Sequence, residues 1–305
     1  MPVELKSATL EQWREVEAEA HQHATPVVLP GALPGFLSER WTPEFLGAVY
    51  PDIKVTVALK LPQEDVPYTA PAESHYRSVQ MREFLRMLAN GEPVYLSQAP
   101  LQGFPGLVRQ LRPSALNLRS IKAVNLWIGG VTRSGLHFDF RDNMFAQVYG
   151  RKRVFLIAPK FARFLYQFPD VPSKSRVDPE NLDLKRFPKF AKCEVLRCQL
   201  EAGDLLFIPR GWWHFVAADD ISVSVNCWHG NRLTWVEFMK VYSAGGPNVA
   251  FCWVRDFVWY GLLGRTYKRR LFSPAALGVE AFDRMSLLLA HKDPGRRKVR
   301  PAAAL

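Results

Sequence analysis

Short apolar runs with the character of β-strands dominate the middle of the chain. From Lys122 onward, segments rich in Val, Ile, Phe and Trp alternate with Gly, Pro and Asp, which favour turns. The runs span residues 123–128, the segment around His137, 144–149, 153–158, 194–200, 204–209, 212–216 and 221–228. Many short strands at this spacing are typical of a β-sandwich or a β-barrel. The pattern therefore predicts a core made mainly of β-strands.

Helical and strand patterns are mixed ahead of this core. Thr9 and Gln12 have the spacing of a capping box, and apolar residues follow them at helical intervals, namely Leu10, Trp13, Val16 and Ala20. The elements expected in order are this helix, a strand within 25–35, a helix after Thr42 and Pro43, a strand over 53–59 and a helix over 78–90. The N-terminal part is thus expected to contain α/β elements.

The helical pattern returns after Gly230. Thr234 and Glu237 form a second capping-box pair at the start of a segment that carries many aromatic residues. We therefore expect an N-terminal helix over residues 1–24, a β-domain over 25–230, and a C-terminal helical region over 231–305 that ends in a basic tail.

Composition and charge narrow the class of protein. The chain has 305 residues, of which 48% are hydrophobic and 23% charged, as expected for a folded domain with a sizeable core. The formal net charge is +11, and from Arg265 onward ten Lys/Arg face three acidic residues. Such a cluster can attract phosphates or acidic partners, although a solvated charged face is the common alternative.

No feature of the chain points to export or to a membrane. The first twenty residues lack the basic and apolar segments of a signal peptide, so we expect a cytoplasmic protein. The most apolar late stretch, 249–263, contains Arg255 and Asp256 and is too short to cross a bilayer of about 30 Å. Four cysteines without paired CxxC spacing predict free thiols rather than disulfides or a structural zinc site.

The strongest candidate chemistry lies in the segment His137-Phe138-Asp139. Residues two apart in a strand point to the same face, so this imidazole and carboxylate would converge inside a barrel. His214, in the run EAGDLLFIPRGWWH, is the best third ligand because the other five histidines lack such a setting. Two His and one carboxylate on one face of a metal leave open positions, as in non-haem iron(II) oxygenases. An isolated HxD pair alone would be weak support, since it often arises by chance.

The motifs around these residues resemble a known family. The run SGLHFDFRDNMFAQVYGRKRVFLIAP, followed about 40 residues later by EAGDLLFIPRGWWHFV and then SVSVNCWHG, is similar to the JmjC (jumonji-C), cupin-like proteins, and in particular to their small hydroxylases. The resemblance is dense from about Asn125 to Gly230. It implies a double-stranded β-helix of the jelly-roll or cupin type, flanked by helices.

The resemblance also implies a set of site residues. His137, Asp139 and His214 match the family's iron ligands, and Lys152 matches the lysine that pairs with the distal carboxylate of 2-oxoglutarate. The remaining matches are Ser134, near that same carboxylate, and Asn143 and Asn226, which flank the chelating end of the co-substrate.

Alternation along the strands predicts the direction of three side chains, those of Lys152, Asn125 and Trp127. Lys152 points opposite to its neighbours Arg151 and Arg153, so it faces the barrel interior if the arginines face water. Asn125 and Trp127 share one face of their strand and are candidates to line the pocket, with ordinary barrel packing as the equal alternative.

The resemblance implies a dioxygenase that uses Fe(II), 2-oxoglutarate and O2 to hydroxylate an unactivated C–H bond. A protein or peptide side chain is the first choice of substrate, because small single-domain members of the resembling family commonly act on side chains. The lack of a zinc-binding or chromatin-reading segment argues against histone demethylation. A tRNA is the second choice, supported by a pI of about 9.6 and the basic tail, and a small metabolite is the third. The alternatives are a non-catalytic cupin-fold binding protein and a metal-dependent cupin enzyme that needs no oxo acid.

The C-terminal region is more apolar than a solvated appendage. Its aromatic residues are Trp235, Phe238, Phe251, Trp253, Phe257, Trp259 and Tyr260. We expect a homodimer through these helices, as C-terminal extensions in the family often pair, with packing back onto the same chain as the alternative.

Overall fold

The structure is a computed structural model. It describes residues 3–266 except for positions 6, 10, 14, 16, 18–19, 21–22, 34–39, 60–74, 112–119, 170, 232–233, 235, 238–239 and 241–242. The predicted positions Leu10, Val16, Trp235 and Phe238 and the basic tail beyond 266 lie outside the described residues.

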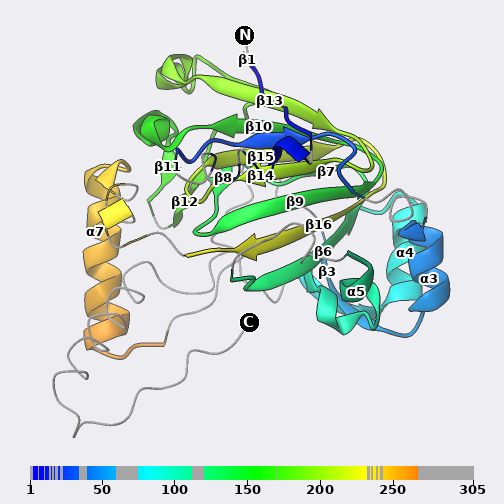
Figure 1. The fold of residues 1–305 in the computed structure, drawn as a ribbon. Coiled ribbons are helices and arrows are strands. Elements are labelled where there is room, and N and C mark those ends of the chain that lie inside the picture. The colour runs from blue at the N-terminus through cyan, green and yellow to red at the C-terminus, as the bar shows by residue number, and fades with distance from the viewer. Residues whose placement is uncertain are drawn as a thin grey trace, which may run out of the picture.

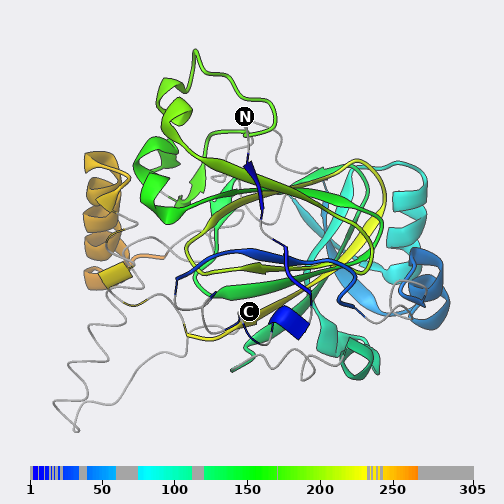
Figure 2. The ribbon, with the colours of Figure 1, turned by 45° about the horizontal axis from the view of Figure 1, so that its top comes forward.

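Two mainly antiparallel sheets face each other and form the body of the molecule (Figures 1 and 2). The first sheet has the order β1-β13-β10-β15-β8-β12-β11, with β7 paired to β15. Its strands are β1 (Val3–Glu4), β7 (Thr132–Arg133), β8 (His137–Phe138), β10 (Lys152–Ile157), β11 (Gln167–Phe168), β12 (Val171–Ser175), β13 (Val195–Leu200) and β15 (Trp213–Ala218). This arrangement confirms the predicted jelly-roll core.

The second sheet has the order β2-β14-β9-β16-β6-β5-β3-β4. Its strands are β2 (Val27–Leu29), β3 (Lys54–Leu59), β4 (Tyr76–Gln80), β5 (Val94–Pro100), β6 (Ala123–Gly129), β9 (Asp142–Tyr149), β14 (Leu205–Ile208) and β16 (Ser222–His229). Every strand predicted from residue 123 onward is present within a few residues of its predicted bounds, because each was marked by a dense apolar run.

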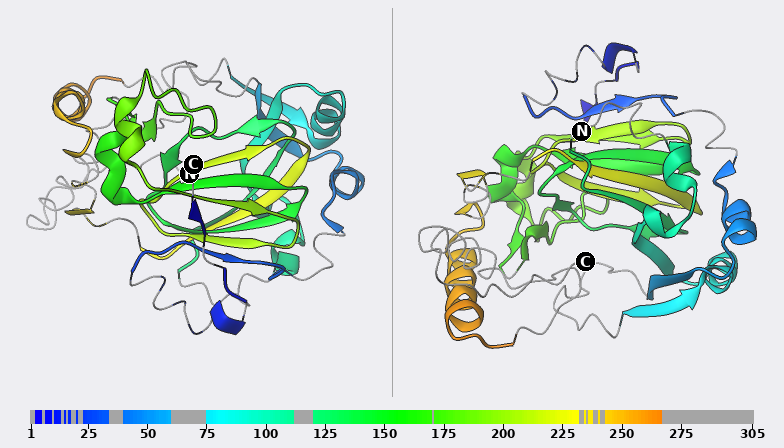
Figure 3. Two further views of the ribbon diagram at one scale, coloured as in Figure 1. Left: turned by 90° about the horizontal axis from the view of Figure 1, so that it is seen from above. Right: turned by 60° about the horizontal axis from the view of Figure 1, so that its bottom comes forward.

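Helices lie at opposite ends of the two sheets (Figures 1 and 3). At one end are α3 (Pro43–Val49), α4 (Met81–Ala89) and α5 (Leu107–Leu111), and at the other is α7 (Pro247–Asp256), continued by the π-helix η6 (Phe257–Leu262). Short 3-10 helices are η2 (Leu101–Gly103), η4 (Pro159–Phe164) and η5 (Pro188–Lys192). No described helix has both the length and the apolar character needed to cross a membrane.

Local signals in the sequence account for several helix starts. Thr42 caps α3 by accepting a hydrogen bond from the Phe45 N–H at 3.2 Å. Both predicted capping boxes are also confirmed: Thr9 exchanges hydrogen bonds with Gln12, and Thr234 does so with Glu237.

One predicted boundary is wrong. The helix expected from Ser78 begins only at Met81, because residues 78–80 pair with Thr56, Val55 and Lys54 in β4 and β3. A partner strand that is remote in sequence thus overrides the local helical pattern.

Alternation along the second sheet separates two environments. Val124, Leu126 and Ile128 of β6 point into a large core with the flanking helices. Asn125, on the opposite face, points toward the first sheet, and polar residues of β9 and β16 do the same. Polar side chains therefore line part of the space between the sheets, beside an apolar cluster that includes Phe145, Leu156 and Leu206.

Candidate metal centre

Neighbouring strands bring the two predicted histidine ligands together. His137 of β8 and His214 of β15 are direct partners in the sheet register, and their ring centroids lie 4.2 Å apart. Asp139 follows β8, and its Oδ2 lies 3.8 Å from His214 Nε2. One ligand atom from each of the three residues lies within 4.8 Å of the others, as a shared metal ion requires.

Backbone contacts set the orientation of both imidazoles. His137 Nδ1 lies 2.9 Å from the Gly135 carbonyl, and His214 Nδ1 lies 3.0 Å from the Trp212 carbonyl. An Nδ1–H that donates to a carbonyl leaves Nε2 with a free lone pair, which is the form that binds a metal. Burial lowers the pKa of His214 and holds the pKa of His137 well below its ordinary value, so both rings are neutral at physiological pH.

The third ligand, Asp139, is held by contacts that the sequence analysis missed. The indole N–H of Trp228 donates to Asp139 Oδ2 at 3.0 Å, and the Gly211 N–H donates to the Asp139 carbonyl at 2.8 Å. Trp228 lies two residues after Asn226 on β16, so it shares the face that Asn226 presents to the site. That spacing was the available signal for a positioning residue.

Lys152 is a cation buried in the space between the sheets. Its side chain is 3% exposed, whereas Arg151 is exposed and Arg153 is partly exposed, as alternation predicted. It is on the same face of β10 as Leu156, the register partner of His214. Burial lowers the pKa of Lys152 to about 7. Its ammonium lies over the Phe145 ring, 5.5 Å from the centroid, and no described carboxylate pairs with it.

A cluster of amides adjoins the predicted ligands. Asn226 Oδ1 accepts hydrogen bonds from Asn125 Nδ2 at 3.2 Å and from Trp127 Nε1 at 2.7 Å. The buried Asn226 Nδ2 and Asn143 Oδ1 have no hydrogen-bond partner in the described structure. Asn125 and Trp127 therefore orient Asn226, and two polar atoms remain for a ligand.

The Ser134 hydroxyl contacts the backbone on both sides of its segment. Its hydroxyl accepts a hydrogen bond from the Val216 N–H at 2.9 Å and donates to the Gly135 carbonyl at 3.1 Å. These contacts tie the segment before β8 to β15. The hydroxyl thus holds Ser134 beside β15, and its expected place near the distal carboxylate of 2-oxoglutarate remains a prediction.

Tyr95 of β5 is a partly buried tyrosine that the sequence analysis overlooked. Its ring lies beside Trp127, with centroids 5.9 Å apart, and burial raises the pKa of Tyr95. A Cβ at Gly129 would lie 2.6 Å from the Tyr95 ring and 2.7 Å from Thr132 Cγ2, so only glycine permits this packing. No local motif marks Tyr95, because β5 reaches the site only through its pairing with β6.

Lys174 is a second overlooked cation. It lies on β12 directly opposite His137 in the register and interacts electrostatically with Asp139, His137 and His214. Burial lowers the pKa of Lys174 to about 8, although the Asp139 carboxylate opposes this shift. Nothing in the sequence marked Lys174 as part of the site, because this residue lies in an insertion far along the chain from the HxD motif.

Other aromatic and imidazole side chains near the motifs point away from the metal ligands. Phe138 and Trp213 pack edge to face in a cluster outside the first sheet. His229 is buried and follows Trp228 on β16, so it points to the opposite face of the strand. Its ring centroid lies 6.1 Å from that of Phe207. The four cysteines are free thiols, as predicted, with Cys227 and Cys252 buried.

Comparison with known proteins agrees with this geometry. A model of the cupin-like domain matches residues 13–234. The chain belongs to the cupin-like family. This cupin-like protein is 30% identical over 254 residues to the tRNA wybutosine-synthesizing protein 5 of Mus musculus, a match that covers 73% of this chain and 75% of that protein.

Other relatives carry demethylase names. The chain is 33% identical over 151 residues to the lysine-specific demethylase JMJ30 of Arabidopsis thaliana, covering 46% of this chain and only 34% of that protein. A match of 38% over 108 residues to the lysine-specific demethylase 8 of Xenopus tropicalis spans 24% of that protein. The JmjC-type resemblance predicted from the motifs is thus confirmed, and the relatives include lysine-specific demethylases and tRNA wybutosine-synthesizing proteins.

The residues of this cupin-like protein fit a divalent metal with an organic acid beside it. Three neutral or anionic donors converge, a buried ammonium faces the same interior, and two orphaned amide atoms adjoin them. An isolated buried cation is costly unless an anion accompanies it.

Proposed function

We propose that this cupin-like protein is an Fe(II)- and 2-oxoglutarate-dependent dioxygenase that hydroxylates an unactivated C–H bond. The observation that carries the proposal is the buried Lys152 ammonium, which has no described carboxylate partner and lies on the face that leads to His214. A bound dicarboxylate would supply the anion that the buried Lys152 ammonium lacks. A cupin enzyme that needs no oxo acid would leave this lysine without a function.

Each residue of the site then has a defined part. His137 Nε2, His214 Nε2 and Asp139 hold the iron, and Lys152 pairs with the distal carboxylate of 2-oxoglutarate. Asn226 Nδ2 and Asn143 Oδ1 flank the chelating end. When bound, iron(II) with 2-oxoglutarate and O2 supplies the oxidising power that converts C–H to C–OH, with succinate and CO2 as co-products.

The protein contributes orientation and shelter. The backbone carbonyls on both Nδ1 atoms fix the imidazoles, and Trp228 fixes the carboxylate. Phe145, which is 7% exposed, covers Lys152 and helps to exclude water, so that the ion pair forms in a medium of low polarity.

The identity of the oxidised group is the finer part of the proposal. A protein side chain was the first choice from the sequence and remains a prediction, for a protein we expect to be cytoplasmic. A nucleic-acid substrate is the second candidate, and one observation favours it: the match to tRNA wybutosine-synthesizing proteins extends over about 70% of their length, far more than the match to the demethylases.

Succinate formation tests the reaction class. Anaerobically purified protein loaded with Fe(II) should convert 2-oxoglutarate to succinate slowly on exposure to O2, even without a prime substrate. His137→Ala should abolish this turnover, and Lys152→Ala should raise the 2-oxoglutarate concentration needed at least tenfold. Lys122→Ala, at an exposed site before β6, is the matched control.

Direct titration of 2-oxoglutarate separates the alternatives. Binding without turnover would indicate an enzyme gated by its substrate. Absence of binding in the metal-loaded protein would contradict the proposal and favour a non-catalytic cupin-fold binding protein.

A further inference from the structure

The insertion between β10 and β13, residues 159–192, meets the barrel through a pair of carboxylates. Asp178 and Glu180 follow β12, and their side chains are only 15% and 17% exposed. Asp178 Oδ1 accepts hydrogen bonds from the Glu180 N–H at 2.8 Å and from the Asn181 N–H at 3.1 Å. The local backbone therefore holds both carboxylates in place. Anionic groups with so little exposure need cations beside them.

Two arginines of the first sheet supply these cations. Arg133 of β7 and Arg153 of β10 are both register partners of Ala217, because β15 runs between their strands. The side chains of register partners point to the same face of a sheet, and Ala217 packs in the cluster outside the first sheet. Since the side chain of Ala217 is a single methyl group, it leaves room for one carboxylate between the two arginines.

Glu180 bridges the two arginines. Its Oε1 accepts a hydrogen bond from Arg153 Nε at 2.7 Å, and its Oε2 lies 3.1 Å from Arg133 Nη2. Arg133 Nη1 also donates to Asp178 Oδ2 at 3.1 Å, and Arg153 donates to both carboxylate oxygens of Asp219. The hydrogen bonds with Asp219 and Glu180 raise the pKa of Arg153. We name these five residues the arginine clamp.

The arginine clamp differs from an ordinary surface ion pair. Isolated exposed pairs stabilise a protein little, whereas networks of several charges with two-point arginine contacts are the exception. Here one carboxylate serves two arginines, and each arginine contacts two carboxylates. The clamp thus joins β7, β10, the turn after β15 and the insertion.

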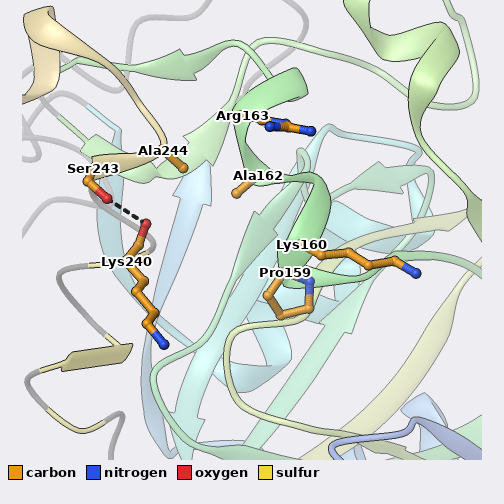
Figure 4. A pocket seen from close by; sticks show the side chains of 7 residues that line it. All are labelled: Pro159, Lys160, Ala162, Arg163, Lys240, Ser243 and Ala244. Carbon is orange, nitrogen blue, oxygen red and sulfur yellow. Dashed lines mark hydrogen bonds between the residues drawn. The ribbon is translucent and has the colours of Figure 1, made fainter.

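A cavity between η4 and residues 240–244 is a separate feature of the same insertion (Figure 4). Its lining is mainly apolar, and the charged ends of Lys160, Arg163 and Lys240 point away from it. The lining residues are Pro159, Lys160, Ala162, Arg163, Lys240, Ser243 and Ala244, none of which belongs to the clamp. The charges that tie the insertion to the barrel therefore lie in the clamp.

The clamp fixes the backbone that carries Lys152. Lys152 directly precedes Arg153, so its side chain points to the opposite face and is buried between the sheets. The other anchor of the clamp is firm, because Ser134, next to Arg133, exchanges two hydrogen bonds of 2.9 Å with Val216 on β15. A shift of Arg153 relative to β15 would therefore move the root of the Lys152 side chain.

We propose that Glu180 is a positioning residue for the co-substrate, which acts on the affinity for 2-oxoglutarate through Arg153 and Lys152. The inference rests on the proposed function, because it concerns the same co-substrate pocket. Lysine is a point charge on a flexible stem, so its ammonium meets a carboxylate in a fixed place only if its backbone is held. Glu180 holds that backbone from outside the barrel by joining Arg153 to Arg133 across Ala217.

Calorimetric titration of 2-oxoglutarate into the Mn(II)-loaded full chain tests the proposal. Glu180→Gln keeps the shape of the side chain and removes its charge, so the affinity for 2-oxoglutarate should fall about tenfold. The affinity for Mn(II), measured by competition with a chelator, should change less than about twofold, because the clamp does not touch the predicted metal ligands. Glu83→Gln is the matched control, since it breaks an exposed ion pair with Arg77 outside the clamp and should bind 2-oxoglutarate as the wild type does.

A double-mutant cycle separates positioning from a general loss of structure. In a Lys152→Ala background, Glu180→Gln should weaken binding no further, because the lysine that it positions is absent. Equal losses in both backgrounds, or wild-type affinity in Glu180→Gln alone, would overturn the proposal. Asp219→Asn, at a side chain 63% exposed, is the milder variant if Glu180→Gln does not fold, and it should weaken binding about threefold in the Lys152 background only. A wild-type protein that binds no 2-oxoglutarate would instead contradict the proposed function, so the two failures are distinguishable.

Discussion

Burial lowers the pKa of Lys152 to about 7, so in the absence of a ligand its ammonium loses a proton near physiological pH. A bound carboxylate favours the charged form and raises this pKa. The affinity for 2-oxoglutarate should therefore be constant well below pH 7 and fall as pH rises above 7, approaching tenfold per pH unit. Titration of the Mn(II)-loaded protein between about pH 6.5 and 8.5 measures this. Lys152→Arg, whose guanidinium stays charged, should bind without that dependence, and a flat wild-type profile would contradict the assignment.

Trp228 contacts the predicted ligand Asp139 and would influence a bound metal through that carboxylate. Trp228→Phe removes the 3.0 Å hydrogen bond to Oδ2 and keeps an aromatic ring, so the affinity for Mn(II) should fall about 10- to 100-fold with little loss of fold. Competition with a chromophoric chelator measures the affinity. Trp41→Phe is the matched control, because it loses an indole hydrogen bond to Gln110 far from the metal centre. Equal metal affinity in both variants would show that Trp228 does not position Asp139.

At the scale of elements, helix α7 shows two faces. Val249 and Cys252 pack into the cluster outside the first sheet, whereas Phe251 and Val254 are 68% and 54% exposed. The helix therefore folds back onto its own chain with one face and leaves the other available. We propose that a second copy covers this exposed face, in keeping with the homodimer expected from the family.

Variants on the exposed face of α7 test the dimer. Phe251→Ser combined with Val254→Ser should leave a folded monomer, because both side chains leave the cluster on the barrel untouched. Light scattering after gel filtration gives the mass. Val131→Ser, at a side chain 72% exposed outside the C-terminal region, should stay dimeric. A wild-type protein that is monomeric at every concentration would exclude the dimer.

For the whole molecule, burial of the Lys152 ammonium lowers the free energy of unfolding. Transfer of the Lys152 ammonium into the barrel lowers its pKa from about 10.5 to about 7, so the charged form destabilises the native state below pH 7 and this cost disappears as pH rises toward 10.5. Lys152→Met should therefore increase the free energy of unfolding of the metal-free protein by about 2–4 kcal/mol at pH 7. Urea denaturation measures this change, and the exposed Lys122→Met should alter it by less than about 0.5 kcal/mol. A destabilised Lys152→Met protein would mean that an unseen anion already pairs with the lysine.

The sequence by itself determined the features that depend on neighbouring residues. Apolar runs identified β6, β8, β9, β10 and β13 to β16, although β5, β11 and β12 were not predicted. Alternation gave the inward direction of Lys152, and the HxD motif with the distant His214 identified the three residues that converge. These are short-range properties, because strand periodicity and capping depend on residues a few positions apart.

Only the tertiary structure decided the features that depend on strand pairing between remote segments. Lys174 lies beside His137 because β12 pairs with β8, Trp228 reaches Asp139 from β16, and Tyr95 enters through β5. Ser134 likewise has backbone partners because β15 lies next to its segment. Which remote strands become neighbours depends on burial and register summed over the whole barrel, and no local pattern encodes that sum.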